Sequence, residues 1–147
     1  MTSWYQLRVR HRTMLTNLIQ QGLLDSSYPA HVDAHPGDRV LSHQMMEELF
    51  GTAQLALSEM MWTVFNFGPI NKTKMGNQLA LIRGPSQYVG TPRVTNACLS
   101  LHAAYIENDR KRTIHCIMAL RREINFVRPH LQALMELERA IWAASWF

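Results

Sequence analysis

Apolar side chains recur at helical spacing along most of the sequence, and this periodicity constrains the fold more than any other feature. At about 100° per residue, one face of residues 42–65 would carry Met46, Leu49, Ala53, Leu57, Met60 and Val64. Glycine- and proline-rich stretches separate such segments, and no internal repeat or linker divides the chain. We therefore predict an all-α fold. It should be a single helical domain over residues 1–147, a bundle of about five helices with two long irregular loops.

Capping and turn residues indicate where the N-terminal helices begin and end. The first helix should run from about residue 3 to residue 21. A surface loop rich in proline, glycine, serine and aspartate should follow over residues 22–40. The second helix, capped by Ser42, should continue to about residue 65. Residues 66–91 contain six glycines and prolines and should be irregular.

Three more helices are expected in the C-terminal part of the sequence. Thr91 followed by Pro92 is a typical helix start, and the polar residues 107–109 should end that third helix. A fourth helix is expected over residues 110–128. Pro129 should then begin a fifth helix that continues to the C-terminus. Apolar side chains cover most of the circumference of this last helix, which is typical of a central helix or an interface.

Composition narrows the class of protein. Of the 147 residues, 47% are hydrophobic and 18% are charged, which favours a folded domain over a disordered chain. No apolar run is long enough to cross a bilayer, and the N-terminus lacks the pattern of a signal peptide. Cys98 and Cys116 are too few for a disulfide framework, and both fall on apolar stripes. We expect a cytoplasmic protein with no membrane partner.

Charge is distributed unevenly along the chain. The net charge is +4, yet residues 25–59 carry six acids and one base, whereas residues 60–106 carry four bases and no acid. The densest group of bases lies in the helix expected over residues 110–128, on the side opposite its apolar stripe. This pattern indicates a cationic surface for a phosphate backbone or another polyanion.

The basic helix face favours one function above the others. We predict a non-enzymatic helical subunit of a larger nucleoprotein or viral assembly, which binds RNA or single-stranded DNA through that face. Phe126 lies among the bases and would stack on nucleobases. The candidate nucleic-acid-binding residues are Arg110, Lys111, Arg112, His115, Arg121, Arg122, Arg128, Lys72, Lys74 and Arg83.

Two alternatives remain open. A protein-only adaptor or inhibitor would use the same basic face to dock on an acidic partner protein. A metal-dependent hydrolase would use His31, Asp33 and His35, with Asp38 or His43 as a fourth ligand. The three loop residues lack a recognisable supporting shell, and no catalytic motif occurs elsewhere in the sequence. We therefore expect no catalytic residue, no metal and no cofactor.

Aromatic residues at two places indicate contacts with other protein subunits. Leu55 and Trp62 should lie on the polar side of the second helix, where they need a second partner. Further aromatic residues gather at the C-terminal end of the chain. The candidate interface residues are Trp62, Trp142, Trp146 and Phe147.

Overall fold

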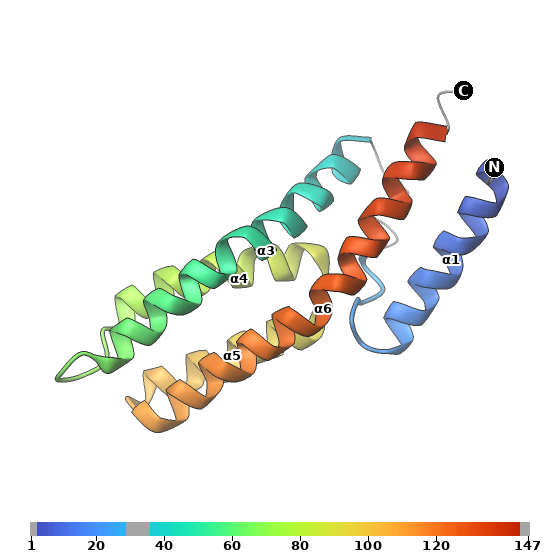
Figure 1. The fold of residues 1–147 in the computed structure, drawn as a ribbon. Coiled ribbons are helices and arrows are strands. Elements are labelled where there is room, and N and C mark those ends of the chain that lie inside the picture. Colours follow the sequence, from blue (N-terminus) through green and yellow to red (C-terminus); the bar gives the residue numbers. More distant parts are fainter. Residues whose placement is uncertain (1–2, 29–35, 145–147) are drawn as a thin grey trace.

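The structure is a computed structural model that describes residues 3–28 and 36–144, and within these ranges it contains helices and no strand. The helices are α1 (Trp4–Gln20), α3 (Pro36–Phe65), α4 (Lys72–Val89), α5 (Pro92–Ile106) and α6 (Arg110–Ala144). Figure 1 shows α3, α4, α5 and the first half of α6 side by side in a bundle, while α1 lies along the C-terminal half of α6. The prediction of an all-α bundle of about five helices is confirmed.

The core forms where the apolar faces of the bundle helices meet. The stripe predicted on α3, from Met46 to Val64, is buried along its whole length. It packs with fully buried side chains of the other three helices, among them Ile82, Leu101 and Leu120. Each such side chain contributes about 1.5–3 kcal/mol through burial, so this core holds the four helices in register.

The prediction of an irregular segment over residues 66–91 is wrong, because α4 occupies most of it. Asn71 caps this helix, with its side-chain oxygen accepting a hydrogen bond from the backbone N–H of Lys74 at 3.0 Å. Gly90 ends the helix in the left-handed conformation, with φ at 87°. Both ends of the helix therefore have standard caps.

Tertiary packing overrides the helix-breaking residues inside α4. Gly76 lies against α5, where an added Cβ would be 3.4 Å from the hydroxyl of Tyr105. Gly84 and Pro85 also lie within the helix, although proline lacks the N–H that the helical hydrogen bond needs. The cost is offset by a buried stripe at helical spacing, which consists of Met75, Leu79, Ile82, Pro85, Ser86 and Val89.

The predicted boundaries are also wrong at two prolines. Pro129 lies inside α6, which continues unbroken because Val127 and Leu131 are buried on either side of it. Pro36 begins α3, well before the predicted cap, since proline is preorganised for the first helical position. Ser42 is consequently a buried residue within the helix and does not cap it.

Helix α1 packs against the C-terminal half of α6. A capping box fixes its start: the backbone N–H of Gln6 donates to the Ser3 hydroxyl at 3.1 Å, and the N–H of Ser3 donates to the Gln6 side chain at 3.0 Å. Leu7 then packs with Leu137 and Ile141 in a small second core. No helix in the described part of the chain is long and apolar enough to cross a membrane.

Candidate functional site

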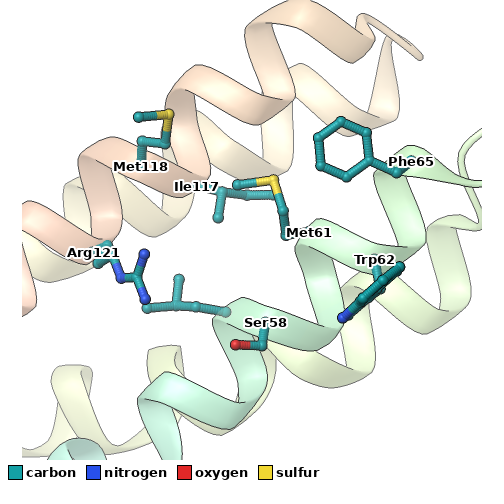
Figure 2. Close-up of a pocket in the computed structure, with 8 residues that line it drawn as sticks. Ser58, Met61, Trp62, Phe65, Ile117, Met118 and Arg121 are labelled. Atoms are coloured by element: carbon teal, nitrogen blue, oxygen red, sulfur yellow. The ribbon is translucent and has the colours of Figure 1, made fainter.

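A groove lies between α3 and the first half of α6. Its cavity volume is about 300 Å³. The buried side chains of Leu57 and Ile117 and the half-buried Met61 form its floor. Figure 2 shows Met61 and Ile117 between the two helices, with Arg121 at one end of the groove and Phe65 at the other. We call this feature the α3/α6 groove.

Large apolar side chains along the rim of the α3/α6 groove are exposed to solvent. Trp62 is 71% exposed, Phe65 is 61% exposed, and Met118 on α6 is 48% exposed. Leu55, which is 73% exposed, lies two turns of α3 before Trp62. Gathered apolar side chains of this size are typical of a surface that another molecule covers.

Three of the predicted basic residues of α6 are held by the protein itself. Arg110 donates to two backbone carbonyl oxygens of the loop between α3 and α4, at 3.1 and 2.5 Å. Arg112 forms an ion pair with Glu107 at 3.0 Å. Arg128 donates to the backbone carbonyl of Phe50 at 2.5 Å, and its guanidinium lies over that phenyl ring. Arg110 and Arg128 therefore tie α6 to the loop after α3 and to α3 itself, while the exposed Arg112–Glu107 pair adds little stability.

The other four of the predicted bases of α6 are exposed and form no ion pair within the described ranges. Arg121 makes only a long contact, 3.4 Å, with the side chain of Gln54. The acid in this part of α6, Glu123, is already engaged by Arg93 at 2.8 and 3.1 Å. Helical spacing places these bases within one or two turns of Met118, and Arg121 among them lines the groove. This basic strip consists of Lys111, His115, Arg121 and Arg122.

The structure does not bring the bases of α4 together with the basic strip. Lys72 is exposed, Lys74 lies 4.0 Å from Glu59 of α3, and Arg83 is half-buried. Helix α4 packs between α3 and α5, whereas α6 packs against the other sides of those two helices. The bases of α4 therefore do not extend the basic strip.

A buried carboxylate joins three separate parts of the chain. One oxygen of Glu138 accepts a hydrogen bond from Nε2 of His11 at 2.8 Å. The other accepts from Nε2 of His43 at 2.7 Å and from the hydroxyl of Tyr28 at 2.6 Å. These four residues, the Glu138 cluster, connect α1, the segment after it, α3 and α6.

Electrostatics fix the protonation states of two members of the Glu138 cluster. Burial raises the pKa of Glu138, but the hydrogen bonds from His11, His43 and Tyr28 outweigh it and hold the pKa below its usual value. Burial and the adjacent carboxylate raise the pKa of Tyr28 well above its usual value. Glu138 is therefore ionised at neutral pH, and Tyr28 keeps the proton that it donates.

The Glu138 cluster was not predicted from the sequence. A local signal does exist, because Glu138 falls within the apolar last helix, between Leu134 and Ile141 on its buried side. Periodicity indicates that such a carboxylate is buried, and a buried carboxylate needs donors. It does not identify the donors, which lie far away in the sequence at residues 11, 28 and 43.

The predicted interface and metal-ligating residues lie in different environments. Trp62 is exposed on the groove rim as expected, whereas Trp142 is half-buried, with its ring 4.5 Å from that of His43. No group of metal-ligating side chains occurs among the residues that the structure describes, and His43 is bound to Glu138. The side chain of Asp38 is not described. The candidates outside the described residues are Trp146, Phe147, His31, Asp33 and His35.

Both cysteines are free thiols. Cys98 is fully buried, as its place in an apolar stripe predicts, and burial raises the pKa of its thiol to about 12. Cys116 is half-buried, and burial raises its pKa too. Neither sulfur is therefore poised as a thiolate nucleophile at neutral pH.

Solved structures of plant proteins have the same fold. A protein from rice described as a histidine-containing phosphotransfer protein superimposes with a TM-score of 0.78 at 18% identity, over 95% of this chain and 98% of its own. A histidine-containing phosphotransfer protein from maize gives 0.75 at 19% identity, over 92% and 99%. One from Medicago truncatula gives 0.73 at 22% identity, over 94% of both chains. No family model matches the sequence, and the comparison with curated proteins gave no match.

These matches contradict the function that the basic helix face favours. The proteins that share the fold over nearly the whole chain are described as phosphotransfer proteins, not as nucleic-acid-binding subunits of a nucleoprotein or viral assembly. The expected RNA or single-stranded DNA partner is therefore wrong. The metal-dependent hydrolase is contradicted by the same matches. Charge patterning failed here because it does not distinguish a polyanion from an acidic protein, nor an exposed arginine from one held by the fold.

Proposed function

We propose that the chain is a non-enzymatic signalling adaptor that has the fold of histidine-containing phosphotransfer proteins and acts by docking on other proteins. The observation that carries the proposal is the similarity in fold to the rice, maize and Medicago truncatula proteins over at least 92% of each chain. A phosphotransfer protein has to contact the proteins between which the phosphoryl group passes, and an adaptor with the same fold also has to contact its partners. A surface for docking is therefore the first requirement of this function.

The α3/α6 groove and the basic strip support docking on a protein. Interface cores are enriched in tryptophan, phenylalanine, methionine and arginine. The groove presents these types together, as Trp62, Phe65, Met118 and Arg121. The basic strip favours a partner whose contacting surface is acidic, because complementary charge speeds association and selects the partner.

The proposed adaptor works in the cytoplasm as one domain over residues 1–147. Its free cysteines support a reducing compartment, where disulfides are rare. It needs no cofactor and carries out no catalytic step. Its contribution to signalling is the contact itself.

Affinity capture in the cells that make the protein tests this function. The tagged full chain should capture specific proteins, and these should stay bound after nuclease treatment. Charge reversal in the basic strip, Arg121→Glu together with Arg122→Glu, should reduce that capture about tenfold or more. The new glutamates would face the acidic surface of the partner, and like charges in contact cost several kcal/mol.

A charge-matched variant on another surface is the control. Arg8→Glu with Arg12→Glu changes the net charge equally on exposed positions of α1, and it should capture the same proteins as the unchanged chain. Partners that disappear on nuclease treatment, or equal losses in both double variants, would contradict the proposed function.

A further inference from the structure

We infer that the α3/α6 groove binds an amphipathic helix of a partner protein, with apolar side chains on the face that enters the groove and acidic side chains beside it. This inference rests on the proposed adaptor function, and it adds the site and the chemistry of the partner.

The spacing of the lining residues suits a helix. Leu57, Met61 and Phe65 follow one another at intervals of four residues on α3, and Ile117 and Arg121 do the same on α6. Rows of this kind form the ridges between which the side chains of another helix pack. The groove lining on α3, from Leu57 to Phe65, extends about 12 Å at 1.5 Å per residue, which is about two turns of a bound helix.

The polarity of the groove disfavours an extended peptide. The polar side chains that line it are those of Ser58 and Arg121, and the rest of the lining is apolar. An extended segment would place its backbone N–H and C=O groups against this floor with too few partners. A helix satisfies those groups internally and presents only side chains.

Charge identifies the flanks of the partner helix as acidic. Arg121 closes one end of the groove, and the rest of the basic strip lies alongside Met118. On the α3 side, Glu59 is within 4.0 Å of Lys74, and Glu47 pairs with Arg139 at 2.5 Å. The surplus charge beside the groove is therefore positive, and carboxylates on the partner would meet it.

A synthetic peptide provides the direct test. The probe is a fluorescein-labelled amphipathic helix of about four turns, with leucines at positions i, i+3, i+4 and i+7 and glutamates on both sides of them. Fluorescence anisotropy should show saturable binding to the full chain. Trp62→Ala and Arg121→Glu should each weaken binding about tenfold, as loss of a central anchor does.

Matched controls separate the groove from the rest of the surface. Leu81→Ala removes an apolar side chain of α4 that is 49% exposed, and it should leave the affinity unchanged. A second peptide, with lysines in place of the glutamates, should bind about tenfold more weakly or worse, because its charges meet the basic strip. Trp62 and Arg121 are exposed, so both groove variants should fold, and circular dichroism would verify this.

Several outcomes would overturn the inference. They are absence of peptide binding, equal affinity in the Trp62→Ala and Leu81→Ala chains, or preference for the lysine peptide.

A dimer in sedimentation experiments that dissociates in the Trp62→Ala chain would assign the groove to a second copy. A single-stranded oligonucleotide that competes with the peptide would assign it to nucleic acid. If nuclease-resistant capture depends on Arg121 and Arg122 but not on Trp62, the adaptor function stands and the groove inference fails.

Discussion

At the scale of single residues, Glu138 is the buried group at which distant parts of the chain meet. Its carboxylate is buried and accepts three hydrogen bonds, from His11, Tyr28 and His43. A buried carboxylate without such donors would destabilise the fold strongly. Since the donors come from different parts of the chain, the Glu138 cluster fixes α1 and α3 against α6.

We expect Glu138→Gln to destabilise the protein by about 1–3 kcal/mol at neutral pH, since donors are left facing a neutral amide. The folded-state pKa of Glu138 is lowered, so its contribution is complete above the ordinary glutamate pKa of about 4.3. That contribution is lost as the pH falls through the lower folded-state pKa. Urea unfolding at a series of pH values should therefore show the variant and the unchanged chain converging in acid.

Glu136→Gln is the matched control, because Glu136 lies on the same helix and is exposed. Its unfolding free energy should stay within about 0.5 kcal/mol of the unchanged chain. A Glu138→Gln chain that is equally stable at neutral pH, or a difference that does not change with pH, would show that the carboxylate is not what holds the cluster.

At the scale of helices, the sequence predicts the apolar faces better than the ends. The stripes of α3 and α5 and the first part of α6 are buried as their periodicity predicts. The errors concentrate at Gly76, Gly84, Pro85 and Pro129, which break isolated helices yet lie inside packed ones. The helix-propensity penalty of glycine or proline at such a position is about 1–3 kcal/mol. Burial of the flanking apolar side chains contributes more than this penalty.

Gly90, which ends α4, allows a test at this scale. Its φ of 87° disfavours any residue with a Cβ, and an added Cβ would lie 2.8 Å from Cγ of Asp25 and 2.9 Å from the Ser27 hydroxyl. Gly90→Ala should therefore destabilise the protein by about 1–3 kcal/mol in urea unfolding.

The glycine control lies in the middle of α3. An added Cβ at Gly51 meets no atom within 4 Å, and its backbone is helical. Gly51→Ala should stabilise the protein by about 0.5–1 kcal/mol. A Gly90→Ala chain as stable as the unchanged one would show that the left-handed conformation at Gly90 is not what ends α4.

At the scale of the whole molecule, the charge pattern needed the structure before it could be interpreted. The sequence shows a cluster of bases in residues 110–128, but only the fold shows that Arg110 and Arg128 are bound to backbone carbonyls of other segments and that Arg112 is paired with Glu107. The apolar groove beside the remaining bases is equally invisible in the sequence, because it needs α3 and α6 side by side. Leu55 and Trp62 were recognisable in the sequence, as large apolar side chains on the polar side of their helix.

The central claim is that this protein binds other proteins through the α3/α6 groove, and its methionines allow one direct measurement. Met61 and Met118 line the groove, whereas Met14 and Met135 lie away from it on α1 and the C-terminal half of α6. In NMR spectra of methionine-methyl-labelled protein, the captured partner should shift the resonances of Met61 and Met118 and leave those of Met14 and Met135 in place. Shifts confined to Met14 and Met135 would contradict the account.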